Sequence, residues 1–216
     1  MVKINDLLKR FFDIVFSIIG IIILTPFFII IYIVIKIDSK GPVFFKQDRL
    51  GINGSVFKIY KFRSMVVNAE FIGTGLFNFA NDPRVTKVGG FMRKTSIDEL
   101  PQLLNILKGD MSFVGPRPPV TYELGDYKDF DSTLKKCYTV KPGVTGLAQI
   151  NGRNELSRDE KIKYDFQYVE SYHKWGLLLD LKIMIITIFK VITMEGSHEL
   201  SENMESDSAK IKTPKP

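Results

Sequence analysis

The apolar stretch IVFSIIGIIILTPFFIIIYIVI, residues 14–35, dominates the N-terminal part of this 216-residue sequence. At about 1.5 Å per helical residue it is about 33 Å long, enough to cross a bilayer core of roughly 30 Å. Pro26 lies near its middle and removes one backbone hydrogen bond, so we expect a kink there, beside the hydroxyl of Thr25. The stretch therefore predicts a bent membrane helix.

The topology of this helix has three interpretations. A plain transmembrane helix fits the hydropathy, whereas a cleaved signal peptide does not, because the run is long and no small-residue cleavage site follows it. Basic residues flank the run on both sides: Lys3, Lys9 and Arg10 before it, and Lys36, Lys40 and Lys46 after it. The positive-inside rule therefore selects no orientation. We favour the third interpretation, a re-entrant helix that turns at Thr25-Pro26 and leaves by the face it entered.

The composition bounds the rest of the chain. With 45% hydrophobic and 25% charged residues it is typical of a folded protein, and its net charge of +6 indicates an anionic partner. That partner could be nucleic acid, anionic lipid or a phosphorylated small molecule, but no nucleic-acid-binding motif is present. The single cysteine, Cys137, excludes an intrachain disulfide, and two scattered histidines, His173 and His198, lack the spacing of a structural zinc site.

Composition also divides the chain into parts: a membrane segment, residues 1–40; a cytosolic or interfacial domain, residues 41–194; and a polar tail that is predicted to be disordered, residues 195–216. In the middle part, a turn signal at Asn53-Gly54 between β-branched and aromatic residues predicts a hairpin of strands 43–49 and 56–62. The glycine-containing stretch 68–82 is predicted to be a mobile loop.

Three helices are predicted after this loop. The first, residues 96–108, has Ser96 and Glu99 in capping-box spacing, and the second, residues 157–175, opens in the same way. The third, residues 177–194, is apolar but interrupted by charges, which favours a helix at the membrane surface or docked on the core. The fold class is therefore predicted to be α+β and mostly helical, with a small hairpin, interfacial amphipathic helices and a monotopic membrane segment.

Asp98 and Glu99 are the candidates for chemistry. Taken alone they fit an ordinary helix start, with Glu99 completing the capping box and Asp98 complementing the helix dipole. The many phosphate-binding side chains nearby favour an active site instead: Lys61, Arg63, Arg84, Lys87, Arg93, Lys94, Arg117 and Arg153. Paired carboxylates among cations suit a phosphoryl transfer assisted by Mg²⁺, with Asp98 and Glu99 as its ligands. Asp165 falls within the apolar face of its helix, where an unpaired charge is costly. A structural ion pair with an arginine explains it as well as a role in the active site does.

Five motifs, in order, resemble the bacterial sugar transferase family, the monotopic phosphoglycosyl transferases that begin glycan assembly on undecaprenyl phosphate. They are KQDRLG (46–51), YKFRSM (60–65), DPRVTKVG (82–89), RKTSIDELPQLLNILKGDMSFVGPRP (93–118) and KPGVTGLAQINGR (141–153). The resemblance covers the chain up to about residue 194. Thr25-Pro26 stands where the family usually has Ser-Pro, and Gly90 stands where a larger basic residue is common.

The resemblance implies a reaction in two steps at the cytoplasmic face of the bacterial inner membrane. Asp98 would attack the sugar-bearing phosphorus of a UDP-sugar and release UMP, and polyprenyl phosphate would then take the phosphosugar from Asp98. Glu99 would place Mg²⁺ or the incoming phosphate. The substrate-binding positions implied are Lys61, Arg63, Arg93, Arg117, Arg153, Asp165 and Asp180. The alternatives are a nucleic-acid-binding protein, which leaves residues 14–35 unexplained, and a non-catalytic membrane scaffold of a glycan assembly complex, which leaves Asp98 and Glu99 without a role.

Overall fold

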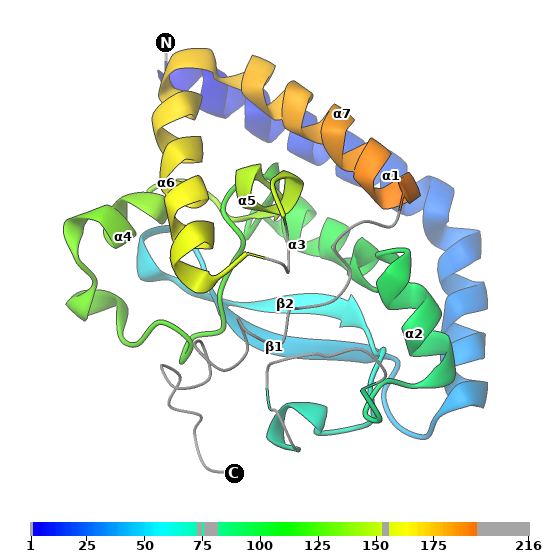
Figure 1. The fold of residues 1–216 in the computed structure, drawn as a ribbon. Coiled ribbons are helices and arrows are strands. Elements are labelled where there is room, and N and C mark those ends of the chain that lie inside the picture. Colours follow the sequence, from blue (N-terminus) through cyan, green and yellow to red (C-terminus); the bar gives the residue numbers. More distant parts are fainter. Residues whose placement is uncertain (1, 73–74, 76–81, 153–155, 194–216) are drawn as a thin grey trace.

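The computed structural model describes residues 2–72, 75, 82–152 and 156–193. Arg153, the tail 195–216 and most of the loop 68–82 lie outside these described residues. Within them the protein is mostly helical, with one antiparallel hairpin and one short parallel strand pair (Figure 1). This confirms the predicted α+β class.

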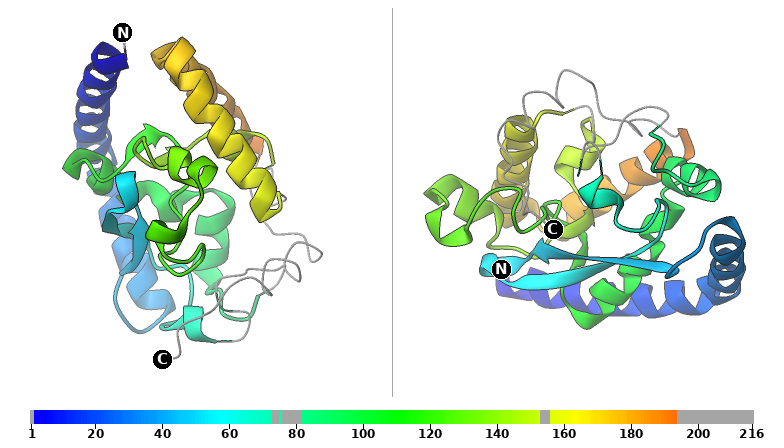
Figure 2. Two further views of the ribbon diagram at one scale, coloured as in Figure 1. Left: turned by 90° about the vertical axis from the view of Figure 1, so that its left-hand side faces the viewer. Right: turned by 90° about the horizontal axis from the view of Figure 1, so that it is seen from below.

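Helix α1 (Val2–Asp38) contains the apolar run and is bent, as two perpendicular views show (Figures 1 and 2). Pro26 lies inside it, and the Thr25 hydroxyl donates to the Ile21 carbonyl at 2.7 Å. The predicted bend is therefore present, although the backbone stays helical throughout. By length and composition α1 is long and apolar enough to cross a membrane, and its apolar residues are mostly exposed.

Strands β1 (Phe44–Leu50) and β2 (Val56–Phe62) form the predicted hairpin. They are antiparallel, with Phe44 opposite Phe62 and Leu50 opposite Val56, and a 3₁₀ turn, η1 (Ile52–Gly54), joins them. Phe62 packs in a core cluster with the second half of α1 and with Met92 of helix α2 (Lys87–Lys94). The hairpin thus packs against the second half of α1 and against α2.

The predicted helix 96–108 is present in two pieces, η3 (Ile97–Gln102), a 3₁₀ helix, and α3 (Leu103–Lys108), which ends at Gly109 with φ 95°. The predicted capping box was wrong. Ser96 adopts a left-handed conformation, with φ 57°, and its side chain makes no capping hydrogen bond. The physical reason is that the Glu99 side chain is held by basic residues across the cavity described below and does not turn back to cap the helix.

Several short elements were not predicted. Strands β3 (Ser112–Val114) and β4 (Gly143–Thr145) pair in parallel, and their backbones approach so closely at Gly115 and Gly143 that a Cβ at Gly143 would lie 2.1 Å from the Gly115 nitrogen. The remaining short elements are η2 (Ala69–Phe71), η4 (Tyr127–Asp129), α4 (Ser132–Cys137) and α5 (Leu147–Ile150).

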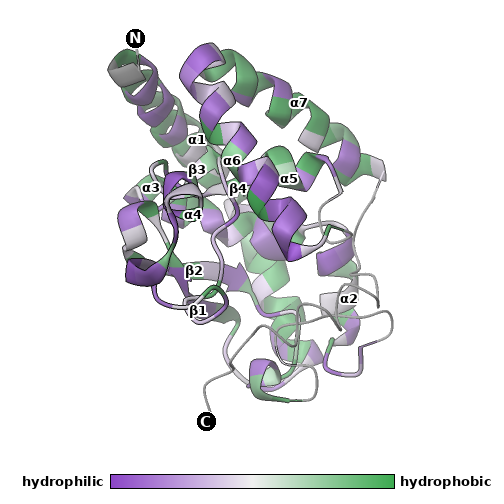
Figure 3. Ribbon diagram, turned by 60° about the vertical axis from the view of Figure 1, so that its left-hand side comes forward, coloured by the Kyte–Doolittle hydropathy of each residue, from purple (hydrophilic) through white to green (hydrophobic). Residues whose placement is uncertain are grey.

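Helices α6 (Arg158–Trp175) and α7 (Leu177–Thr193) complete the domain. The predicted capping box of Ser157 and Glu160 is confirmed at the start of α6. The inner faces of both helices pack on β3 through a cluster that includes Val114, Tyr168 and Ile183. Figure 1 shows α7 and the first arm of α1 along the same side of the molecule, away from the hairpin, and Figure 3 shows that both helices carry many apolar residues.

Candidate active site

A polar cavity of about 490 Å³ lies between the hairpin, η3, the loop after β3 and α6. It brings together side chains that are far apart in the sequence. Of the predicted site residues, seven line it: Lys61, Arg63, Arg93, Asp98, Glu99, Arg117 and Asp165. Of the predicted cations, Lys61, Arg63, Arg93 and Arg117 therefore line the cavity with the two carboxylates, whereas Arg84, Lys87 and Lys94 do not, and Arg84 pairs with Asp82 instead.

Asp98 is buried in this cluster, with 8% of its surface exposed. Burial raises the pKa of its carboxyl group, whereas the charges of Lys61, Arg93 and Arg117 act in the opposite direction. A carboxylate stripped of water but held by cations is an oxygen nucleophile with few competing solvent contacts. The site therefore suits attack by Asp98 on an electrophile that itself carries negative charge.

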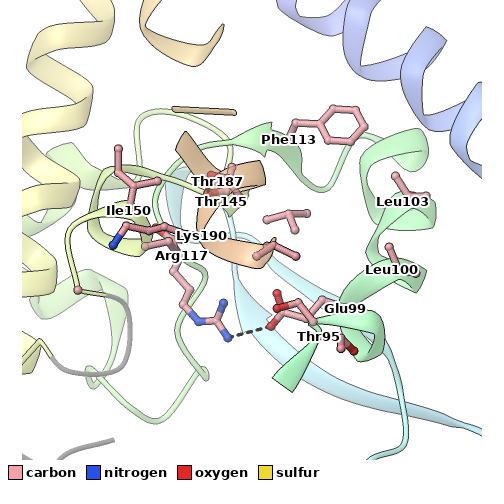
Figure 4. Close-up of a pocket in the computed structure, with 15 residues that line it drawn as sticks. Thr95, Glu99, Leu100, Leu103, Phe113, Arg117, Thr145, Ile150, Thr187 and Lys190 are labelled. Carbon is pink, nitrogen blue, oxygen red and sulfur yellow. Dashed lines mark hydrogen bonds and ion pairs between the residues drawn. The ribbon is translucent and has the colours of Figure 1, made fainter. Parts of the chain in front are cut away.

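Glu99 is held by two cations. Its Oε1 atom accepts hydrogen bonds from Lys61 Nζ at 2.7 Å and from Arg117 Nη2 at 3.2 Å, and Figure 4 shows the second of these. Arg117 projects from the segment Pro116–Pro118, whose prolines restrict its backbone, and the Glu99 charge raises the pKa of its guanidinium. Burial lowers the pKa of Lys61. Glu99 thus fixes two of the cations that line the cavity.

Asn105, which the sequence analysis missed, fixes the position of the η3–α3 segment relative to the hairpin. It is completely buried on α3, accepts from the Tyr60 backbone N–H at 2.9 Å and donates to the Lys58 carbonyl at 2.7 Å. These bonds tie α3 to β2 and so place Lys61 opposite Glu99. The Asn-Ile-Leu-Lys-Gly pattern gave no local signal for this contact, because both partners are backbone groups of a distant strand.

Asp165 enters the cavity from α6 without an ion pair among the described residues. Its Oδ1 atom is buried and has no hydrogen-bond partner in that part of the chain, so the alternative of a structural pair with an arginine is not observed there. Burial raises the pKa of Asp165 to about 8, against the opposing charges of Arg117 and Lys161. This pKa favours the protonated form of the Asp165 carboxyl group at neutral pH.

A second cavity, of about 420 Å³, adjoins the first and has mostly apolar walls (Figure 4). The two cavities share Glu99, Arg117 and Gln149. Gln149, on α5, is 9% exposed, and neither atom of its amide group has a hydrogen-bond partner among the described residues.

Comparison with known proteins decides the family. The sequence matches the model of the family described as bacterial sugar transferase over residues 4–194. The chain belongs to this family. The galactosyl transferase CpsE of Streptococcus agalactiae is 46% identical over 200 residues, which are 88% of this chain and 43% of the relative. The UDP-glucose:undecaprenyl-phosphate glucose-1-phosphate transferase of Escherichia coli is 42% identical over 193 residues, 87% of this chain and 40% of the relative.

A relative of similar length is the exopolysaccharide production protein ExoY of Sinorhizobium fredii, 40% identical over 209 residues, which are 90% of each chain. The chain therefore spans about two fifths of the length of the first two relatives and most of the third.

Two predicted site residues of this family member are bonded to groups outside the cluster around Asp98 and Glu99. Arg63 borders the polar cavity, but its guanidinium donates to the carbonyls of Ser39 at 2.7 Å and Lys40 at 2.5 Å, where it fixes the end of α1. Asp180 borders neither cavity. Its carboxylate accepts hydrogen bonds from Lys9 and, at 2.8 Å, from the Tyr168 hydroxyl, so it anchors the first arm of α1 to α6 and α7. This placement does not support a substrate contact by Asp180, because both of its oxygens are bonded within the protein.

Arg49 is a further residue of the site that sequence reasoning missed. Its guanidinium donates to the Pro118 carbonyl at 2.9 Å and to Gln47 at 2.7 Å, and burial lowers its pKa to about 10. It therefore supports the loop that carries Arg117. Arg49 belongs to the motif KQDRLG, which carries part of the family resemblance. That motif was the only sequence signal for Arg49, and it assigned this arginine no role.

Whether this chain could hold the predicted Mg²⁺ depends on its carboxylate side chains. The described residues contain no group of three or more His, Cys, Asp or Glu side chains that could hold a metal ion. Mg²⁺ bound with substrate phosphates needs only one or two protein carboxylates, and Asp98 and Glu99 both face the polar cavity. Asp98 and Glu99 are therefore the residues that would hold a Mg²⁺ ion bound together with substrate phosphates.

Proposed function

We propose that this chain transfers a sugar 1-phosphate from a UDP-sugar to undecaprenyl phosphate and releases UMP. The single observation that carries the proposal is Asp98, buried in a polar cavity with Lys61, Arg93 and Arg117 around it. Two relatives support the proposal: one is a UDP-glucose:undecaprenyl-phosphate glucose-1-phosphate transferase, and another is an undecaprenyl-phosphate galactose phosphotransferase. The reaction starts the assembly of a surface glycan.

The proposed chemistry consists of two displacements at one phosphorus atom. An Asp98 oxygen forms a bond to the sugar-bearing phosphorus, and the bond to the UMP oxygen breaks, with its electron pair leaving on UMP. An oxygen of the lipid phosphate then attacks the same phosphorus and the Asp98 carboxylate leaves. Lys61 and Arg117 would offset the charge of the phosphates, and Glu99 holds both of them in place. Mg²⁺ bound by Asp98, Glu99 and the substrate phosphates would neutralise further negative charge.

The membrane association of the proposed enzyme is supported by the apolar outer face of α7. Residues spaced three or four apart on this helix are exposed: Leu178, Leu181, Ile185, Ile188 and Ile192. A water-soluble surface rarely exposes so continuous an apolar patch. Together with α1, this face suits a protein that is embedded in one leaflet, with the cavity on the cytoplasmic side of the bacterial inner membrane.

The deciding experiment is the substitution Asp98→Asn. We expect it to lower UMP release from UDP-sugars by about 10³-fold or more, because the amide cannot form the acyl phosphate that the first step needs. The control is Asp126→Asn, an exposed carboxylate, which should leave the rate unchanged. Thermal unfolding verifies the fold, and the amide should not destabilise it because it removes a buried charge.

Mass spectrometry of the wild type with donor alone should find a phosphosugar on Asp98. An adduct on another residue, or an Asp98→Asn variant that retains activity within about tenfold, would contradict the nucleophile. Folded wild-type protein without turnover on any UDP-sugar would favour the non-catalytic scaffold.

A further inference from the structure

The apolar cavity beside the active site has walls from elements that meet only in the tertiary structure. Figure 4 shows Leu100 and Leu103 of the η3–α3 segment on one side and Thr187 of α7 on the other. The Thr187 hydroxyl is bonded to the Thr145 hydroxyl at 2.6 Å, so neither presents a free polar group to the cavity. The remaining apolar walls come from Phe113, Val144, Ile150 and Val191. The lining therefore suits hydrocarbon.

The polar end of this cavity is the active site. Glu99 and Arg117, which form the ion pair next to Asp98, border both cavities, and so does Gln149. The Gln149 amide is nine-tenths buried and unpartnered among the described residues, which is costly unless a ligand bonds to it. Lys190 adds a cation to the lining. A ligand with a phosphate at one end and an apolar chain at the other matches both parts.

We propose that this cavity binds the isoprene units next to the phosphate of the lipid acceptor, with the phosphate at Arg117 and Gln149. The inference rests on the proposed function and adds to it a separate entrance for the acceptor. The volume of about 420 Å³ lies in the range of small-molecule sites, so it takes the first units of the chain and not the whole lipid.

Continuity with the membrane-facing surface supports this occupant. Val191 forms part of the cavity wall, and the next residue, Ile192, is 71% exposed on the apolar outer face of α7. The distal isoprene units would leave along this face into the bilayer. A nucleotide donor fits the polar cavity instead, which is lined by several arginine and lysine side chains. The two substrates would then reach the same carboxylate from different sides and would not compete for one opening.

The test compares two phenylalanine substitutions at adjacent positions of α7. Val191→Phe fills the apolar cavity, whereas Ile192→Phe adds the same ring outside the cavity and keeps the outer face of α7 apolar. We expect Val191→Phe to raise the KM for undecaprenyl phosphate by about tenfold, with the KM for the UDP-sugar changed by less than about twofold. Ile192→Phe should change neither. Equal effects of the two variants on the lipid KM, or an equal rise in the donor KM for Val191→Phe, would overturn the proposal.

Photolabelling gives a measurement that needs no turnover. A polyprenyl phosphate with a diazirine on its first isoprene unit should label the peptides that contain Leu103 and Val191 in wild-type protein, and undecaprenyl phosphate should compete. Val191→Phe should lose this labelling and Ile192→Phe should keep it. Labelling confined to the outer face of α7 or to α1 would overturn the proposal. A wild type that is labelled in the cavity but transfers no phosphosugar would refute the proposed function and leave the lipid site standing.

Discussion

Two carboxyl groups of the active-site cavity are buried, but they face different surroundings. Asp98 lies among Lys61, Arg93 and Arg117, which all oppose the effect of burial on its pKa. Asp165 has only Arg117 and Lys161 against the effect of burial, and its pKa rises to about 8. We therefore expect Asp98 to supply the nucleophilic oxygen and Asp165 to present a proton-bearing group to the substrate.

The raised pKa of Asp165 predicts a dependence of stability on pH. The native state keeps this proton up to about pH 8, whereas the unfolded chain loses it near the ordinary value of 3.8. Because the native state binds more protons in this window, the free energy of unfolding falls as pH rises, by up to about 1.4 kcal/mol per pH unit. Arg117 and Lys161 weaken this effect, and Cys137 and Tyr138, whose own pKa values are raised by burial, stay neutral there.

Asp165→Asn removes this titration. Its melting temperature relative to the wild type should therefore increase from pH 5 to pH 8, as measured by thermal unfolding in detergent at several pH values. Asp159→Asn, an exposed position on the same helix, serves as the control and should differ from the wild type by a constant amount. A constant difference for Asp165→Asn as well would show that Asp165 is ionised in the native state at neutral pH.

At the scale of elements, helix α2 positions Arg93 by packing on the segment that follows β2. The Thr86 side chain caps the helix by accepting from the Gly89 N–H at 3.0 Å, and the Thr86 N–H donates to the Ser64 carbonyl at 3.1 Å. Gly89 lies directly against that carbonyl, since a Cβ there would be 1.9 Å from the Ser64 oxygen. The glycine thus sets how closely α2 approaches the cavity.

Adjacent glycines of α2 therefore have opposite expected effects. Gly89→Ala should lower the free energy of unfolding by about 3 kcal/mol and reduce turnover, because backbone must move and Arg93 moves with it. Gly90→Ala should be neutral or raise it by about 0.5–1 kcal/mol, because the nearest atom, of Val85, is 3.9 Å from its Cβ. Denaturant unfolding of both variants, with UMP release, measures this. Similar changes in both variants would show that the close approach of Gly89 to the Ser64 carbonyl does not limit stability.

At the scale of the whole molecule, both ends of α1 are bonded to the same domain. Near its start, Arg10 donates to the carbonyls of Ile106 and Leu107, and Asp13 accepts from the Phe113 N–H at 3.1 Å. At its other end, Arg63 holds Ser39 and Lys40, which directly follow the helix. A straight helix across a bilayer core of roughly 30 Å would put these ends on opposite sides of the membrane. The contacts therefore favour the re-entrant topology that we propose.

This topology predicts the same labelling at both flanks of α1. Single cysteines at the exposed positions of Ile4 and Lys40 should both stay unreactive to a membrane-impermeant maleimide added to spheroplasts, and both should react in inside-out vesicles. The parent protein provides the background, since its native Cys137 is buried. Reaction of one flank alone in spheroplasts would show a helix that spans the membrane.

The sequence by itself determined the elements whose signals are local. The apolar run with its proline, the hairpin around Asn53-Gly54 and the cap at Ser157 depend on neighbouring residues, and all three were predicted. Ser96 was the exception, because its capping pattern competes with distant cations for the Glu99 side chain. The parallel pair of β3 and β4 was missed, since three-residue strands carry no readable periodicity.

Only the tertiary structure decided which residues share the site. Lys61 and Arg63 are two positions apart in one motif, yet Lys61 pairs with Glu99 whereas Arg63 turns to the end of α1. Asp165 lies on the apolar face of one helix and Asp180 interrupts another, apolar helix, so in the sequence both are carboxylates in apolar surroundings. Only Asp165 lines the cavity. The physical reason is that a charged side chain takes the partner that the packed elements bring within reach, and a contact between residues distant along the chain leaves no trace in the local pattern.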